Sequence, residues 1–348
     1  MGGILAARRL KECLDRTCRI APMNADAPYS ALSPETILDA IEAVGYRCDG
    51  RILALNSYEN RVYQIGIEEG APLIAKFYRP ARWSDAMIRE EHAFSLELAA
   101  QEIPVVAPLQ RDGESLHTHL GFRYAVFPRR GGRWPELGVS DDREWVGRFL
   151  GRIHAVGRAA RFHERPRLSI DELGRKSRDF VLDGDWMPDY LATKYADVTD
   201  ALLQEVEAQA DGWRGAMVGR ILGDCHRGNI LWTEQGPHFV DLDDCLTGPA
   251  IQDIWMLLSG GQQEMRTELH DVLKGYDQFL PFDRSEIALI EPLRALRMIH
   301  YSGWLARRWH DPAFPQAFPW FAEPRYWEEH YRALEDQLAA VLGPPLEL

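Results

Sequence analysis

The spacing of apolar residues changes once along this chain of 348 residues. Before residue 128 it mostly alternates, as in "NRVYQIGI" (60–67) and "PLIAKFY" (72–78), which is typical of strands with one buried face. After residue 133 it follows the helical period of about 3.6, as in "EWVGRFLGRIHAVGRAA" (144–160). The Pro/Gly-rich stretch "PRRGGR" (128–133) separates the two patterns. The change of period predicts a β-rich part followed by a helical part.

The β-rich part should also contain two helices. "LSPETILDAIEAVGY" (32–46) has Ser33 to cap its start, Pro34 in its first turn and Gly45 at its end. "SDAMIREEHAFSLELAA" (84–100) has helical spacing as well. The turn "EEGAP" (68–72) should join two strands as a hairpin, and a further strand pair is expected within 106–127, with Asp112-Gly113 as its turn.

We therefore expect an α+β fold with two lobes. A poorly ordered extension is expected over 1–30, where Met23 is a second candidate start. A small β-rich N-terminal lobe should follow over 31–127 and a hinge over 128–133. A larger, mostly helical C-terminal lobe should cover 134–348, interrupted only by short strand-like pieces at 229–232 and 238–242.

Composition excludes some classes of partner. The net charge of −13 argues against nucleic-acid binding, which depends on basic patches. No stretch reaches the 18 or so apolar residues of a membrane span. The five cysteines are odd in number and scattered, which favours a reducing cytoplasm over a disulfide framework. Nothing in the sequence demands more than a monomer.

The stretch "ILGDCHRGNILW" (221–232) carries the strongest functional signal. Four residues separate Asp224 from Asn229, as in the Asp-x-x-x-x-Asn catalytic loop of kinases, and Asp241 follows in "FVDLDD" (239–244). In that chemistry a carboxylate orients the attacking hydroxyl or accepts its proton, while hard oxygen ligands hold Mg²⁺ against a phosphate. Asp224 and Asp241 would then be catalytic, and Asn229 and Asp241 would bind the metal. Taken alone, Asp224 and Asn229 could also be an ordinary turn.

The β-rich part should hold ATP. Lys76 lies inside an expected strand, where an ammonium is costly unless it is paired. Glu91 falls on the apolar stripe of the following helix and is its expected partner, as in the Lys–Glu pair of kinases. Ser57, in the polar turn "NSYENR" (56–61), could cover the phosphates with the backbone amides around it. Each has a simpler explanation: Lys76 could reach solvent, Glu91 could be a solvated helix residue, and Ser57 an ordinary turn serine.

Several segments together resemble the stress response kinase A family of bacterial Ser/Thr protein kinases, within the wider superfamily of aminoglycoside, choline and homoserine kinases. The resemblance runs from about residue 31 to the C-terminus. The segments are "LNSYENRVYQ", "KFYRPARW", "EEHAF", "AVFP", "LGRIHAVGR", "GDCHRGNILW", "FVDLDD", "GPAIQDIWMLL" and "DPAFPQAFPW". It implies a bilobal protein-kinase-like fold and Mg-ATP-dependent phosphorylation of protein Ser/Thr hydroxyls, the kinase itself included.

The resemblance also implies roles for single residues. Asp224 resembles the proton acceptor, Asn229 and Asp241 the Mg²⁺ ligands, and Ser57 and Lys76 the ATP contacts. Asp253, in "DIW", is similar to the residue that anchors the catalytic loop from inside the protein. One position departs from the family pattern, because Leu222 stands where a loop-bracing His is expected. We expect activity to survive this change.

Other functions remain open. A small-molecule kinase of the aminoglycoside, choline or homoserine type is the nearest alternative, because only eleven residues separate Asp241 from Asp253, too few for a long regulated activation loop. An acidic groove in the helical lobe would favour that alternative. The motif "FVDLDDCL" (239–246) also resembles the nucleophile motif of haloacid-dehalogenase-type phosphatases, and Leu222 raises the alternative of a non-catalytic nucleotide-binding module.

Three further expectations concern residues without an assigned role. Asp243 and Asp244 are expected at the surface or behind the metal ligands rather than on the metal. His154, on the apolar face of its helix, is expected to be a core histidine with satisfied hydrogen bonds. The aromatic run "DPAFPQAFPWFAEPRYW" (311–327) should pack over the helical lobe, with substrate docking as the alternative.

Overall fold

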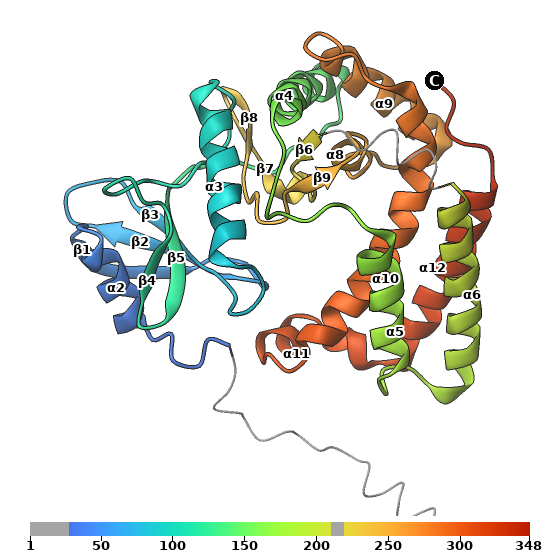
Figure 1. The fold of residues 1–348 in the computed structure, drawn as a ribbon, viewed down its shortest axis with the longest axis horizontal. Coiled ribbons are helices and arrows are strands. Elements are labelled where there is room, and N and C mark those ends of the chain that lie inside the picture. Colours follow the sequence, from blue (N-terminus) through green and yellow to red (C-terminus); the bar gives the residue numbers. More distant parts are fainter. Residues whose placement is uncertain (1–27, 210–218) are drawn as a thin grey trace, which may run out of the picture.

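The structure is a computed structural model that describes residues 28–209 and 219–348 (Figure 1). The extension expected over 1–30 lies outside the described residues, apart from its last three. Across the two described ranges, no helix is long and apolar enough to cross a membrane.

The N-terminal part is built on one five-stranded antiparallel sheet with the order β1-β2-β3-β5-β4. Its β2–β3 hairpin confirms the expected pair of strands, with Val62 opposite Lys76. The sequence folds in this way because apolar residues alternate along both strands and the Glu-Gly turn between them is polar. The strands are β1 (Cys48–Ala54), β2 (Arg61–Ile67), β3 (Leu73–Phe77), β4 (His117–His119) and β5 (Phe122–Pro128).

The expected second strand pair turns at a different place. Asp112 and Gly113 do form a turn, with φ values of +52° and +82° and a bridge between the flanking residues 111 and 114. The hairpin that joins β4 to β5 turns instead at Leu120 and Gly121, whose φ values are +46° and +83°. The expectation was wrong because a leucine in the left-handed region carries no turn signal in the sequence.

Two helices cover the faces of this sheet. Helix α2 (Pro34–Ala43) begins where the Ser33 hydroxyl accepts the backbone N–H of Thr36, as expected, and packs against Ile65 and Phe77 on one face. Helix α3 (Asp85–Ala100) is capped by Ser84, and its Ile88 packs with Ala125 on the other face. Helix α3 therefore lies between the sheet and the helical part (Figure 1).

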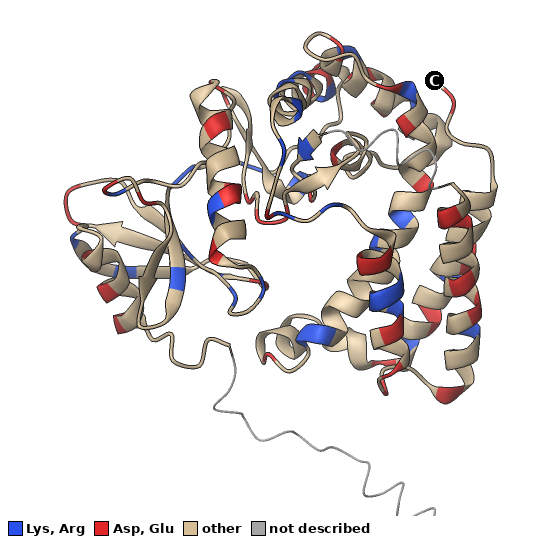
Figure 2. Ribbon diagram, viewed as in Figure 1, with Lys and Arg blue, Asp and Glu red and all other residues tan. Residues whose placement is uncertain are grey.

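The rest of the described chain is mostly helical. Its longer helices are α4 (Ser140–Ala159), α5 (Lys176–Leu182), α6 (Asp189–Ala208), α9 (Gln262–Tyr276), α10 (Ile290–Arg308) and α12 (Pro324–Leu342), with shorter α8 (Gln252–Trp255) and α11 (Ala313–Ala317). One large apolar core runs through them. Acidic residues are spread over the outer helices α6 and α12, in keeping with the net charge (Figure 2). The α+β fold with a sheet-based first part and a helical second part is confirmed.

Two small antiparallel strand pairs interrupt the helices and hold the candidate site. Strand β6 (Gly219–Ile221) pairs with β9 (Leu246–Gly248), and β7 (Ile230–Thr233) pairs with β8 (Gly236–Phe239). The second pair confirms the short strands expected near 229–232 and 238–242. Because all strand pairs in the named sheets of the described residues are antiparallel, the parallel sheet needed by a haloacid-dehalogenase-type phosphatase is missing there.

Candidate active site

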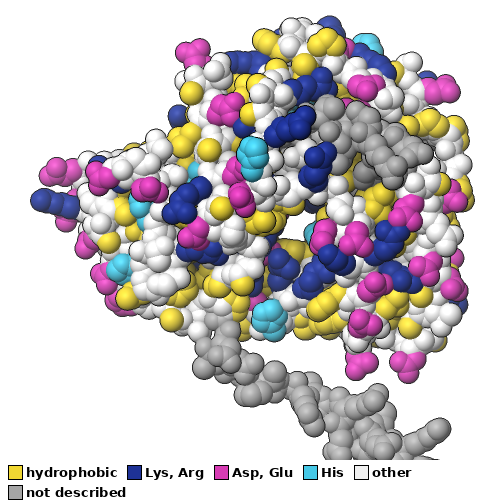
Figure 3. Space-filling model, viewed as in Figure 1, with side chains coloured by type: hydrophobic (Ala, Val, Ile, Leu, Met, Phe, Trp, Pro, Cys, Tyr) yellow, Lys and Arg dark blue, Asp and Glu magenta, His cyan; other side chains and the backbone are white. Residues whose placement is uncertain are grey.

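One cavity of about 1340 Å³ lies between the sheet and the helical part. It opens at the hollow between the two parts of the molecule (Figure 3). Six residues singled out from the sequence line it together: Ser57, Lys76, Glu91, Asp224, Asn229 and Asp241. The structure thus brings together side chains that are up to 184 positions apart in the sequence.

Lys76 lies at the centre of a cluster of carboxylates. Its Nζ is 2.7 Å from Asp241 Oδ1, 3.2 Å from Asp243 Oδ1 and 3.8 Å from Glu91 Oε1. Lys76 is only 5% exposed, and burial alone would lower its pKa, but the three carboxylates outweigh burial and raise the pKa well above the usual value. Lys76 is therefore a fixed positive charge at the base of the cavity.

The expected Lys76–Glu91 contact is present but is the longest of the three. Glu91 is buried at the position of α3 where the apolar stripe predicted it, and its Oε2 has no hydrogen-bond partner within the described part of the chain. Burial raises the pKa of Glu91 to about 7, against the opposing effect of Lys76. Burial thus favours the protonated form of this carboxyl, and the charge of Lys76 beside it favours the ionised form.

Asp243 is buried rather than at the surface, at 2% exposure. It contacts Lys76 and Arg82 and accepts a hydrogen bond of 3.1 Å from the Asn60 side chain. Asp244, in contrast, has a side chain that is 43% exposed and contacts only Arg82 among the described ion pairs. Asp243 thus lies behind Asp241, one of the two places expected for it, and its contact with Lys76 is what the sequence did not show.

The loop that carries Asp224 is fixed from inside the helical part. Asp253, fully buried at the start of α8, accepts the backbone N–H groups of Leu222 and Gly223, each at 2.7 Å. His154 lies 3.0 Å from the same carboxylate and 3.0 Å from the Tyr276 hydroxyl, so it is the satisfied core histidine that was expected. These contacts hold the loop without the His that Leu222 replaces, and the Leu222 side chain packs into the core.

Gly223 makes the sharp turn before Asp224 possible. Its φ is +83°, and a Cβ added there would lie 2.2 Å from the carbonyl oxygen of Asp244. Glycine is required on both counts. After this turn Asp224 lies in the cavity, where its Oδ1 is 2.7 Å from Arg297 and its Oδ2 is 3.5 Å from His226.

The charge state of Asp224 follows from these neighbours. Burial would raise its pKa, but the His226 hydrogen bond and the Arg297 charge outweigh burial and hold the pKa below its usual range. Asp224 is therefore ionised at neutral pH. It is a hydrogen-bond acceptor that can orient a hydroxyl, and a weak base.

Asn229 and Asp241 supply oxygen atoms close to this loop. The Asn229 amide nitrogen donates to the backbone carbonyl of Asp224 at 2.9 Å, which leaves the amide oxygen as a possible metal ligand. Asp241 has φ +57°, a left-handed backbone that Asp tolerates better than most residues, and its side chain is 48% exposed.

No group of three or more His, Cys, Asp or Glu in the described ranges could hold a metal by itself. One carboxylate and one amide oxygen suit a Mg²⁺-type ion that takes its remaining ligands from phosphates and water.

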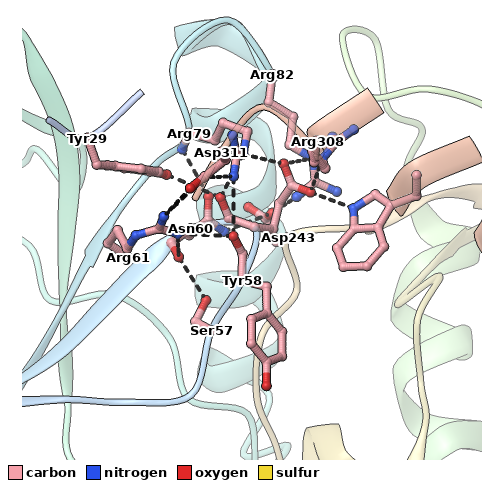
Figure 4. A network of polar contacts seen from close by, with 12 residues as sticks. Tyr29, Ser57, Tyr58, Asn60, Arg61, Arg79, Arg82, Asp243, Arg308 and Asp311 are labelled. Carbon is pink, nitrogen blue, oxygen red and sulfur yellow. Dashed lines mark hydrogen bonds and ion pairs between the residues drawn. The ribbon is translucent and has the colours of Figure 1, made fainter. Parts of the chain in front are cut away.

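The loop 56–61 is held by a network that joins the two parts of the molecule (Figure 4). Asp311, from the chain after α10, contacts Arg79 at 2.7 Å and Arg61 at 3.0 Å. Glu59, from the loop itself, contacts Arg79 at 3.0 Å and Arg308 of α10 at 2.6 Å. We call these five residues the interlobe clasp.

Ser57 lies on the same loop. Its hydroxyl donates to the carbonyl of Asn60 at 3.1 Å, which stabilises the turn. The clasp was missed in the sequence because Arg308 and Asp311 lie 232 to 250 positions from their partners in the N-terminal part. The aromatic run 311–327 was expected to pack over the helical lobe, with substrate docking as the alternative. Phe314 and Phe321 do lie in the core, and Asp311 at the start of the run ties the helical part to the loop.

Apolar residues line the part of the cavity between the sheet and the β7–β8 hairpin. They come from both sides, and include Val62, Ile74 and Phe127 from the sheet and Leu231 and Val240 from the hairpin. Ile74 and Lys76 share one face of β3, so the slot leads directly to the lysine. An apolar lining of this kind suits an aromatic base. Sequence reasoning missed it because its residues read as ordinary strand residues.

Known phosphotransferases and kinases are similar to this chain. Residues 51–290 match the model of the phosphotransferase enzyme family, APH. The chain is 46% identical over 328 residues to "Stress response kinase A" of Salmonella choleraesuis (strain SC-B67), covering 94% of this chain and 99% of that protein. It is 45% identical over 328 residues to "Serine/threonine protein kinase RdoA" of Salmonella typhimurium (strain LT2), with the same coverage.

A solved structure resembles the whole fold. Amicoumacin kinase hAmiN, in complex with AMP-PNP, Ca²⁺ and Ami, superposes with a TM-score of 0.66 at 21% identity, over 87% of this chain and 95% of that one.

Proposed function

This chain belongs to the phosphotransferase enzyme family, and we propose that it transfers the γ-phosphoryl group of Mg-ATP to Ser or Thr hydroxyls of proteins, itself included. It is an ATP-dependent phosphotransferase. The protein acceptor, the autophosphorylation and the choice of Mg²⁺ as the divalent ion are the parts that we propose.

Each side of the cavity then has a task. The apolar slot would take the adenine, and Lys76 would contact the α- and β-phosphates while Glu91 and Asp243 hold it in place. Ser57 and the backbone of its loop would cover the phosphates. Asn229 and Asp241 would hold Mg²⁺, which neutralises phosphate charge when it is bound.

Asp224 would orient the acceptor hydroxyl for in-line attack. The acceptor oxygen forms a bond to the γ-phosphorus, the bond from that phosphorus to the β–γ bridging oxygen breaks, and ADP leaves with that oxygen. The hydroxyl proton goes to Asp224. Because the pKa of Asp224 lies low, the proton would transfer late, and positioning would supply most of the catalysis.

The protein acceptor is supported by one observation above all. Over 94% of its length the chain is 45% identical to a relative named a serine/threonine protein kinase. The short segment between Asp241 and Asp253 favours the second candidate, a small-molecule kinase. Solved structures of the fold do not decide between the two, since their identity with this chain is too low to carry more than the fold.

The acceptor class is tested by incubation with Mg²⁺ and γ-labelled ATP. Protein substrates and a panel of amino alcohols and aminoglycosides would be offered in separate reactions, with Asp241→Asn as the inactive control. We expect label on proteins, and on the kinase itself, that is absent with the variant. Label confined to small molecules would overturn the proposal in favour of the second candidate.

We also propose that the chain acts as a cytoplasmic monomer without nucleic-acid or membrane partners, and that 128–133 is the hinge between lobes 31–127 and 134–348. The backbone of Arg133 pairs with that of Trp232 at 2.7 and 3.0 Å, so the helical end of this segment is tied to the β7–β8 hairpin. Opening for nucleotide exchange would then occur on the sheet side of Arg133.

A further inference from the structure

The cavity that contains Asp224 is also lined by residues of the helical part. One wall of it is formed by the lining residues of two segments, 166–180 and 293–308, which we call the acceptor wall. Five of these side chains are basic, and only one is acidic. They are Arg167, Lys176, Arg297, Arg307 and Arg308, with Glu172 as the acid.

The arrangement follows from the sequence of α10. Arg297, Tyr301, Trp304 and Arg308 are spaced by four, three and four residues, so they share one face of the helix, and that face lines the cavity. Figure 2 shows basic positions along α10 and the neighbouring α5, and Figure 3 shows basic side chains around the hollow between the lobes.

Three of the five basic groups already have carboxylate partners. Arg308 contacts Glu59, Lys176 contacts Glu172, and Arg297 contacts Asp224. Arg297 therefore lies beside the carboxylate that would orient the acceptor hydroxyl and take its proton.

Arg167 and Arg307 are different, because no carboxylate of the described chain lies within 4 Å of either, and Arg307 is the one of the two on α10. Its guanidinium donates to the Ser177 hydroxyl at 2.9 Å and to the Lys176 carbonyl at 3.3 Å, and it lies 5.6 Å from the Phe180 ring. It is half-buried and keeps its charge at any ordinary pH. A half-buried guanidinium held by neutral groups is a ready site for an anion.

The positive charge of this wall also lowers the pKa of a neighbouring histidine. His300 lies on α10, 3.2 Å from the Ser177 hydroxyl. Burial lowers its pKa to about 3, and the charges of Arg307, Arg297 and Arg308 act in the same direction. His300 is neutral at physiological pH and adds nothing to the charge of the wall itself.

We propose that the acceptor wall binds an acidic segment of the protein acceptor, with Arg297 and Arg307 taking carboxylates of Asp or Glu side chains that flank the acceptor Ser or Thr. This deepens the proposed function and rests on it. Ten helical positions separate the two arginines, or about 15 Å along α10. An extended peptide covers that distance in roughly four to five residues. One carboxylate would therefore lie next to the acceptor hydroxyl and the other about four residues away.

The same wall disfavours the alternative acceptors. Amino alcohols and aminoglycosides are cations, and an acidic groove would suit them. Of the five basic side chains in the wall, Arg167 and Arg307 have no carboxylate partner within 4 Å among the described residues, so a cationic acceptor would meet repulsion at these two arginines.

The test compares peptides that differ at one position. Four acceptor peptides would carry one Ser and, four residues from it, Glu, Gln, Lys or phosphoserine. The value of kcat/KM would be measured for each with wild type, Arg307→Gln and Arg307→Glu. Arg325→Gln is the matched control, since Arg325 is an exposed arginine of α12 that pairs only with Glu329 among the described residues.

For wild type and the control we expect the Glu peptide to be preferred over the Gln peptide by about tenfold, in line with one charge-assisted pair. Arg307→Gln should bring that ratio close to one. Arg307→Glu should reverse the order so that the Lys peptide becomes the best substrate, a result that a merely structural role of Arg307 would not produce.

The other outcomes are distinct. Equal use of all peptides by wild type, or a preference for Lys, would overturn the inference while leaving the protein kinase intact. If only the phosphoserine peptide were used, the wall would bind a phosphate of an already phosphorylated acceptor and not a carboxylate. That result would also overturn the inference. No peptide or protein labelling, with small molecules labelled instead, would overturn the proposed function itself.

Discussion

The interlobe clasp makes a quantitative prediction for Asp311→Asn. Asp311 is 2% exposed and receives guanidinium hydrogen bonds from Arg79 at 2.7 Å and from Arg61 at 3.0 Å to each of its oxygens. Asparagine keeps the shape but removes the charge and turns an N–H₂ group toward one of the arginines. Removing one partner of a buried ion pair lowers the free energy of unfolding by about 3–5 kcal/mol. The whole free energy of unfolding of a typical protein is about 5–15 kcal/mol.

The assay is urea unfolding followed by tryptophan fluorescence. With a slope of about 3 kcal/mol per molar urea, the loss should lower the midpoint by about 1 M or more. The KM for ATP should rise as well, because the loop that carries Ser57 loses its tie to the helical lobe. Glu329→Gln is the matched control, since it removes a carboxylate from an exposed pair on α12.

The control should leave both the unfolding midpoint and the KM unchanged. An Asp311→Asn protein with the wild-type midpoint would refute the reasoning, because it would mean that the clasp contributes nothing to stability.

Two further predictions concern the loop and the lysine pair. In Asp253→Asn the amide keeps only one acceptor oxygen, so the buried backbone N–H of residue 222 or 223 loses its hydrogen-bond partner. We expect the free energy of unfolding to fall by about 1–3 kcal/mol, measured by denaturation. Steady-state kinetics should show that kcat falls more than ATP affinity does. For Glu91, the folded-state pKa of about 7 lies above the ordinary value near 4.5, so the folded form favours the proton, and its contribution to stability falls as pH rises from about 4.5 through 7. The Tm of wild type minus that of Glu91→Gln should therefore decrease between pH 5 and pH 8 in thermal melts, and a difference that rises with pH would contradict the burial of this carboxyl.

Local patterns in the sequence were enough for much of the fold. Ser33 and Pro34 marked the start of α2, and alternation marked the β2–β3 hairpin. The apolar stripe of α3 identified Glu91 as a buried carboxyl beside Lys76, because a helical period places a residue on a face without knowledge of the partner. These inferences depend on neighbours within a few residues, which the sequence displays directly.

The rest depends on contacts between distant segments. Asp243 gives no sign in the sequence that it is buried, since its partners Lys76 and Arg82 lie more than 160 positions away. Asp311 and its arginines are similarly remote. The turn at Leu120 was missed because strand pairing selected a left-handed leucine that local propensity disfavours.

Basic residues of the acceptor wall were also invisible as a group, since only the folding of α10 against α5 gathers them around one cavity. The net charge of −13 gave no sign of this local excess of basic side chains, because it describes the whole chain and not one wall of the cavity.

The most direct test of the account is the single-turnover transfer of labelled γ-phosphoryl by Asp224→Asn, with ATP binding measured on the same sample by calorimetry. We expect a transfer rate that falls by about 10²–10⁴-fold, with ATP affinity close to that of wild type, because Asp224 is proposed to contact the acceptor and not the nucleotide. Transfer at the wild-type rate would contradict the assignment of Asp224 and, with it, the placement of the acceptor hydroxyl between this carboxylate and the metal ligands.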